Sequence, residues 1–211
     1  MTVADGTHAP DGVLLAKSLA EKFSLDVSDE PDLAQVAQIV ELRHGRARLI
    51  TFLEHALKDL EPDENLKWLA TLTWKAIFTT NYDRGMERAY ELTANPTQEP
   101  VVVATNSDLK TWEPRFQVPI FHIHGSLFSV EAKESILVSE QDYARFRERR
   151  RMLFDQLRTS YATTPILYIG YSHRDANWKM ITAELRAEFE PSKPPPSYRV
   201  APSTPEIEAR S

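Results

Sequence analysis

The chain has 211 residues, of which 42% are hydrophobic and 27% charged, which suits one soluble domain with a buried core. Its formal net charge of −6 argues against a surface that as a whole attracts nucleic acid or membranes. No apolar run is long enough for a membrane span, and the first residues lack the features of a signal peptide. The sequence has no cysteine, which excludes disulfides, thiolate nucleophiles and cysteine-ligated zinc and is typical of a reducing cytoplasm.

Apolar residues recur at helical spacing in the first part of the chain and predict three helices there. The first covers Val13–Phe23, the second begins around Pro31, and the third carries the apolar stripe from Leu49 to Leu60. Gly45 is expected to separate the second helix from the third. Residues 1–66 should therefore be mainly helical.

Beyond residue 66, short runs rich in Val, Ile, Phe and Tyr alternate with helical segments. This alternation predicts a layered α/β fold with a largely parallel sheet. We interpret residues 1–211 as a single domain, with the strand-and-helix part at 67–202 and a tail at 203–211. The expected helices are Arg84–Leu92, Gln141–Tyr161 and Asp175–Phe189. The expected strands are Lys75–Thr80, Val101–Ala104, Pro119–Ile123, Ser135–Ser139, Pro165–Gly170 and Tyr198–Ala201.

Three of these expected strands end in polar clusters, with the sequences TTNYD (79–83), FHIHGS (121–126) and YIGYSHRD (168–175). In parallel sheets, ligands bind beyond the carboxyl ends of the strands. Three polar strand ends at the same end of one sheet therefore predict the rim of a pocket.

The first cluster allows both functional and structural interpretations. Asn81 can orient a water molecule or a sugar hydroxyl, because its amide both donates and accepts hydrogen bonds. It can equally be a turn residue or a helix cap, and Asp83 can simply cap the next helix.

The second cluster contains two histidines, His122 and His124, which point the same way if their strand is regular. Together they could bind a metal, and either could act as a general base. For His122 the commoner alternative is a hydrogen-bonded histidine of the core. His124 is the better candidate for chemistry, because it lies at the strand end before Gly125, where backbone and ligand can approach closely.

In the third cluster, Gly170 would let a phosphate or ribose approach the backbone, and Ser172 could bind a phosphate oxygen. The alternative is an ordinary turn from strand to helix, with Ser172 or Asp175 as the N-cap.

These three clusters, together with SEQDYARF at residues 139–146, resemble the sirtuin-like (silent information regulator-like) NAD-binding domains of bacteria. The similarity is to the divergent branch found in antiphage defence proteins, and it extends from Pro10 to Pro202. It rests on the order, spacing and strand context of the motifs. It implies a Rossmann-like three-layer fold with a mostly parallel sheet.

The resemblance also implies roles for individual residues. Asn81 matches the catalytic asparagine that positions water and the nicotinamide ribose, and Asp83 matches the aspartate that contacts the nicotinamide carboxamide. His124 matches the general base near the ribose hydroxyls, and Gly170 and Ser172 match the late loop that contacts the adenosine side of NAD. The further NAD-binding positions implied in this way are Thr80, Tyr82, Gly125 and Asp175.

The missing cysteines then distinguish two activities within the family. Protein-deacylating sirtuins carry a zinc module with four cysteines after the histidine motif, whereas here only about ten residues separate Ser126 from the next expected strand. The resemblance therefore implies an NAD glycohydrolase that transfers ADP-ribose to water, with NAD as substrate and no metal. In the defence proteins this activity depletes NAD, so we expect a cytoplasmic bacterial enzyme with a fused or separate sensor or effector domain. A homo-oligomer is compatible with this interpretation.

One family feature is missing. Sirtuin-like domains open with a central strand and a GAGxS loop that cradles the pyrophosphate, whereas ADGTHAPDGVLLAKSL at residues 4–19 resembles only the segment after that loop. A gap in the sheet and a missing phosphate cradle are therefore expected. We favour a chain that is a fragment of a longer protein over a degenerate domain.

Two rival functions remain. One is a metal-dependent hydrolase built on His122 and His124, although HIHGSL lacks an Asp–His continuation. The other is a catalytically inactive domain that senses NAD or ADP-ribose or acts as a scaffold. We interpret the arginine-rich segment as a solvated helix surface where a partner protein could dock, and we do not expect direct nucleic-acid binding. Its arginines are Arg145, Arg147, Arg149, Arg150 and Arg151.

Overall fold

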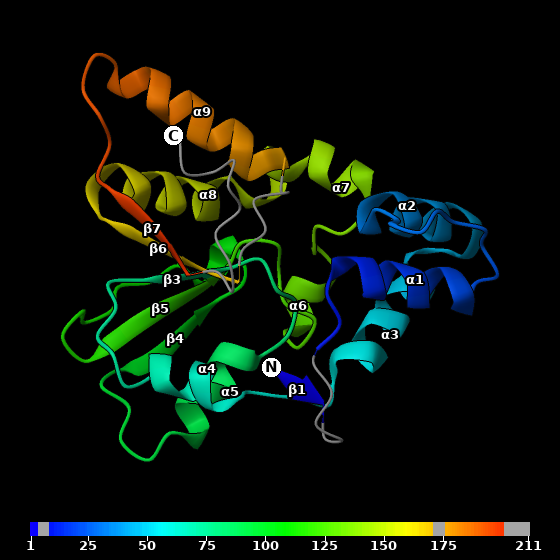
Figure 1. Ribbon diagram of the computed structural model, residues 1–211, viewed down its shortest axis with the longest axis horizontal. Coiled ribbons are helices and arrows are strands. Elements are labelled where there is room, and N and C mark those ends of the chain that lie inside the picture. The colour runs from blue at the N-terminus through cyan, green and yellow to red at the C-terminus, as the bar shows by residue number, and fades with distance from the viewer. Residues whose placement is uncertain (4–8, 171–175, 201–211) are drawn as a thin grey trace. The chain divides into compact units, whose positions relative to one another are not determined.

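The structure, a computed structural model, describes residues 1–3, 9–170 and 176–200. The chain forms two compact units, Met1–Leu153 and Phe154–Ser211. The described helices are α1 Gly12–Lys22, α2 Leu33–His44, α3 Arg46–Leu57, α4 Glu64–Leu69, α5 Gly85–Leu92, α6 Val130–Lys133, α7 Glu140–Ala144, α8 Phe146–Thr163 and α9 Ala176–Phe189 (Figure 1). The described strands are β1 Thr2–Val3, β2 Leu60–Glu61, β3 Ile77–Thr79, β4 Glu99–Val103, β5 Gln117–His122, β6 Ile166–Ile169 and β7 Ser197–Val200.

The three predicted N-terminal helices are confirmed as α1, α2 and α3, which lie together in Figure 1 (blue to cyan). Their apolar stripes, including Leu19 and Leu53, form one buried core because each stripe faces the neighbouring helices. Gly45 ends α2 with a positive φ of 85°, as its predicted role requires. The start of α2 differs slightly from the prediction, since Asp32 caps it by accepting from the backbone of its first turn, and Pro31 precedes the helix.

The sheet of the first unit has the order β3-β5-β4, and all its strands are parallel, which confirms the predicted α/β class. β5 lies in the middle and is buried along nearly its whole length, which explains its continuous apolar sequence. Because β3 and β5 are parallel neighbours, their carboxyl ends meet at the same edge of the sheet. Among the described strands, only β5 pairs with β3.

In the second unit, β6 and β7 form a parallel pair of their own. Helix α9 is joined to the C-terminal part of α8 by Arg158, which contacts Glu184 at 3.0 Å and Glu188 at 2.8 Å. The described strands therefore form separate ladders, and the third polar cluster does not share a ladder with the first two.

None of the helices within the described ranges is long and apolar enough to cross a membrane.

The strand predicted at Ser135–Ser139 is wrong, because this buried segment joins no ladder. Its backbone groups are satisfied from elsewhere: Leu137 donates to the carbonyl of His124, and its own carbonyl accepts from the Tyr82 hydroxyl at 2.7 Å. A buried connecting segment and a buried strand have the same apolar composition, so the pattern alone does not separate them. The helix predicted over Gln141–Tyr161 is likewise two helices, α7 and α8, and α8 has a kink at Arg150.

Candidate active site

Asn81 is the second residue after the end of β3, and both its backbone groups have a hydrogen-bond partner. Its N–H donates to Thr79 Oγ1 at 3.0 Å, and its carbonyl oxygen lies 3.3 Å from Nδ1 of His122. The residue itself is exposed. Its amide is therefore available to solvent or a ligand on a main chain that is fixed on both sides.

The next two residues, Tyr82 and Asp83, are buried, each with 8% of its surface exposed. The Tyr82 hydroxyl donates to the carbonyl of Leu137, and Asp83 Oδ1 accepts from the backbone N–H of Gly85 at 2.7 Å. Asp83 therefore accepts from the first residue of α5, but the N-cap of this helix is Arg84, and not Asp83 as its structural interpretation predicted. Its role toward nicotinamide stays a prediction.

Burial raises the pKa of Asp83 above its ordinary value, and the nearby Glu87 charge adds to the rise, while the Gly85 hydrogen bond and the His122 charge oppose it. The folded state then binds this proton more tightly than the unfolded state, so ionisation of Asp83 lowers stability as the pH rises through the raised pKa. The variant Asp83→Asn keeps an oxygen that can accept from Gly85 but cannot ionise. We expect its stability relative to the wild type to increase from about pH 4 to about pH 7 in urea unfolding. A difference that is the same at both pH values would contradict this.

The two histidines of FHIHGS have different surroundings. His122 is fully buried, and its Nε2 lies 2.8 Å from Oε1 of Glu87, which confirms the predicted core histidine. His124 lies beyond the last residue of β5, with Nδ1 3.4 Å from the Tyr143 hydroxyl and the two rings perpendicular. The two imidazoles face different partners and do not form the metal-binding pair that the rival interpretation requires. Within the described residues, no group of three or more His, Asp or Glu side chains could hold a metal ion.

Gly125 follows His124 at a position that requires glycine. Its φ is +93°, and a Cβ there would lie 2.6 Å from Nη2 of Arg150 and 2.9 Å from Cγ2 of Ile136. The tight fit of Arg150 against this backbone fixes the path of the segment that carries His124.

Arg150 is buried, with 1% of its surface exposed, so the prediction of a solvated arginine surface is wrong for this residue. Its guanidinium donates to the carbonyl oxygens of Ala104 at 2.8 Å, His122 at 3.1 Å and Ser135 at 3.0 Å. Burial lowers the pKa of Arg150 to about 10, so it remains charged at neutral pH. Arg150 therefore joins the ends of β4 and β5 to the connecting segment through charge-assisted hydrogen bonds.

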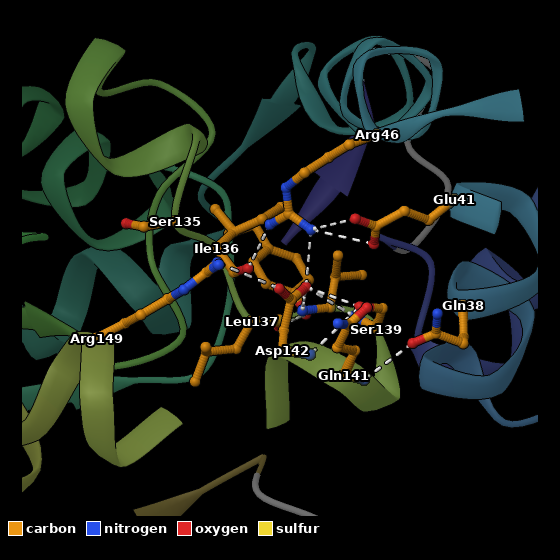
Figure 2. Close-up of polar contacts among 12 residues, drawn as sticks. Gln38, Glu41, Arg46, Ser135, Ile136, Leu137, Ser139, Gln141, Asp142 and Arg149 are labelled. Carbon is orange, nitrogen blue, oxygen red and sulfur yellow. Dashed lines mark hydrogen bonds and ion pairs between the residues drawn. The ribbon is translucent and has the colours of Figure 1, made fainter. Parts of the chain in front are cut away.

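A second polar network holds the helix turn that carries Tyr143 (Figure 2). Asp142 Oδ2 accepts from the backbone N–H and the hydroxyl of Ser139, both at 3.1 Å, and from Arg46 Nη1 at 2.9 Å. Arg46 also contacts Glu41 at 3.1 Å and the carbonyl of Ile136 at 2.8 Å. Sequence analysis missed these roles, although the Ser139–Asp142 spacing is a capping-box signal that could have identified Asp142.

The third predicted cluster begins within β6, in the second unit. Gly170 follows β6 in the second unit, is exposed and has a positive φ of 63°. Ser172 and Asp175 lie outside the described residues. Their roles in binding NAD therefore stay predictions, as do those of Thr80 and Gly125.

Parallel strands whose carboxyl ends carry polar side chains are typical of α/β domains that bind nucleotides. Comparison with known families agrees with this class, because residues 75–211 match the family described as SIR2-like domain. The chain belongs to this family. The sirtuin-like membership predicted from the motifs is thereby confirmed.

Individual curated relatives give more detail than the family match. The chain is 28% identical over 173 residues to the NAD(+) hydrolase ThsA of Cytobacillus dafuensis, covering 82% of this chain and 34% of that protein. It is 27% identical over 171 residues to the NAD(+) hydrolase ThsA of Enterococcus faecium, covering 79% and 34%. A third relative, the NAD(+) hydrolase ThsA of Bacillus cereus (strain MSX-D12), is 27% identical over 179 residues, covering 83% and 36%. The chain thus spans about a third of the length of these relatives.

Proposed function

We propose that this chain is the catalytic part of a bacterial NAD glycohydrolase, which cleaves the nicotinamide–ribose bond with water. The observation that carries the proposal is the pairing of β3 with β5, because it brings Asn81 and the HIHGS segment to one edge of one sheet. The names of the relatives, NAD(+) hydrolase ThsA, support the same reaction.

The reaction needs an oriented nucleophile, a base and a leaving group held in place. The water oxygen bonds to C1′ of the ribose while the C1′–N bond breaks, and the electron pair of that bond neutralises the nicotinamide ring. The transition state resembles an oxocarbenium ion. In this proposal the Asn81 amide orients the water and the ribose, and His124 accepts the proton that the water loses. The products are nicotinamide, ADP-ribose and a proton.

The remaining predicted residues bind NAD in this proposal. Asp83 contacts the nicotinamide carboxamide, and Gly170 belongs to the loop on the adenosine side. The protein acts in the cytoplasm, where it depletes NAD in antiphage defence. A sensor or effector domain, fused or separate, controls it.

We expect Asn81→Ala and His124→Ala each to reduce nicotinamide release from NAD by about 100-fold or more, since each removes a group that acts on the reacting atoms. The matched controls are Asn95→Ala and His55→Ala, which change exposed residues of the same types outside the candidate site. These controls should retain the wild-type rate.

Nicotinamide release is measured for the 211-residue chain and for the same chain with an upstream extension that supplies a strand and a glycine-rich loop. Binding of NAD without nicotinamide release by either form would contradict the proposed activity. That result would support the alternative of a domain that senses NAD or ADP-ribose. Activity that a chelator abolishes would instead favour a metal-dependent hydrolase.

A further inference from the structure

We propose that His122 is a positioning residue for Asn81, and that Glu87 holds the His122 ring in the state that this role requires. The inference rests on the proposed function, because it assigns to Asn81 a side chain that acts on NAD. Within the HIHGS segment, His124 then takes part in the chemistry, and His122 orients Asn81.

The first step is the hydrogen-bonding geometry of the His122 ring. Nδ1 faces the carbonyl oxygen of Asn81 at 3.3 Å, and Nε2 faces Oε1 of Glu87 at 2.8 Å. A carbonyl oxygen can only accept, so Nδ1 must carry a hydrogen for the contact with Asn81 to be attractive. A neutral ring protonated at Nδ1 has a bare Nε2, which would repel an ionised carboxylate. The pair therefore needs one further proton between Nε2 and Oε1, whichever of the two atoms carries it.

The second step is the burial of the groups around this proton. His122 is fully buried and Glu87 is 3% exposed. The second carboxyl oxygen of Glu87, Oε2, has no hydrogen-bond partner among the described residues. A buried carboxylate with a single donor is costly unless a positive charge or a proton compensates it. A hydrogen in the Nε2–Oε1 contact makes that contact attractive and leaves a hydrogen on Nδ1 for the carbonyl of Asn81.

The other charged groups near the pair come from its neighbouring elements. Asp83, in the loop before α5, adds a second buried carboxyl, and Arg150 of α8 donates to the backbone carbonyl of His122 at 3.1 Å. Arg150 therefore holds the main chain of His122 while Glu87 holds its ring.

The consequence falls on Asn81. Thr79 already fixes the N–H of this residue, so the bond from His122 to its carbonyl removes the remaining freedom of its main chain. The exposed side chain of Asn81 then leaves the sheet edge in one direction. A misplacement of about 1 Å in such a group can reduce turnover by about 100-fold.

The test compares two amides at position 122. In His122→Asn the side-chain amide branches from Cγ, as Nδ1 does, so its nitrogen can still donate to Asn81. In His122→Gln the amide nitrogen lies one bond further out, at the level of Nε2, and faces Glu87 instead. With NAD as substrate, we expect kcat to fall about 100-fold for His122→Gln and less than about 5-fold for His122→Asn, with KM changed little in either.

A second variant tests the role of Glu87. In Glu87→Gln the amide can donate to Nε2, which keeps the hydrogen on Nδ1, and we expect kcat to stay within about 5-fold of the wild type. Ring ¹⁵N spectra should show a protonated Nδ1 of His122 in the wild type and in this variant. A bare Nδ1 in the wild type would overturn the inference.

Thermal unfolding of every variant separates positioning from folding. Equal kcat for His122→Asn and His122→Gln, or a loss in both that follows only the fraction of folded protein, would overturn the inference and leave the proposed function intact. No turnover by the wild type, with or without the upstream extension, would overturn the proposed function and the inference together.

Discussion

Replacing Arg150 with methionine is expected to lower the free energy of unfolding by about 3–5 kcal/mol. Methionine has a side chain of similar length, but it cannot donate hydrogen bonds. The carbonyl oxygens of Ala104, His122 and Ser135 would each lose a charge-assisted donor within 3.1 Å. The His122 carbonyl keeps the backbone N–H of Gly125 at 2.9 Å, so the cost arises mainly at Ala104 and Ser135. Each buried acceptor left without a donor costs about 1–3 kcal/mol, and removing the buried charge of Arg150 offsets only part of this cost.

Urea unfolding of Arg150→Met beside Arg145→Met measures this effect. Arg145 belongs to the same arginine-rich segment but is exposed, so its replacement should change stability by no more than about 0.5 kcal/mol. Arg150→Lys is expected to fall between wild type and Arg150→Met, because one ammonium group cannot reproduce the fork of a guanidinium. If Arg150→Met were as stable as Arg145→Met, the three hydrogen bonds would contribute nothing measurable.

The burial of Arg150 within the arginine-rich segment is a feature that the sequence alone does not predict. Five arginines within seven residues indicate a solvated surface, because charge alone gives no reason to bury any of them. Arg150 is buried because carbonyls from three separate segments converge on it, and no local pattern records that convergence. The same limit explains why the apolar pattern of Ser135–Ser139 predicts a strand. Its backbone groups bond to side chains such as Arg46 and Tyr82 and to the carbonyl of His124, and not to a neighbouring strand.

Helices α1, α2 and α3 were predictable because each has an apolar stripe that only a helical period explains. The meeting of Asn81 with His122 was predictable in outline, because parallel strands place their polar ends at one edge. Glu87 was not predictable as a partner of His122. A glutamate within a short helix indicates an exposed face, whereas here it is buried against a histidine 35 residues away.

Replacing Asp142 with asparagine is expected to lower the free energy of unfolding by about 2–3 kcal/mol. Its 5% exposure leaves little solvent screening, and asparagine keeps the size of the side chain while removing the charge that Arg46 faces at 2.9 Å. Burial alone would lower the pKa of Arg46, but the hydrogen bonds and charges of Asp142 and Glu41 raise it above its ordinary value. Glu41 remains as a partner of Arg46 in this variant. The free energy of unfolding should therefore fall by less than it would if the Arg46 charge lost every partner.

A double-mutant cycle isolates the pair. Combining Asp142→Asn with Arg46→Gln should give a coupling energy of about 1–3 kcal/mol. The two side chains contact each other, and both also hydrogen-bond to the backbone of residues 136–138. The pair Lys133–Glu54, at 3.2 Å and with both side chains 33% exposed, is the matched control and should couple by less than about 1 kcal/mol. Equal coupling in the two pairs would mean that burial adds nothing to the Asp142–Arg46 contact. A larger value for Asp142 and Arg46 would show that the turn carrying Tyr143 toward His124 is held from the helical part of the first unit.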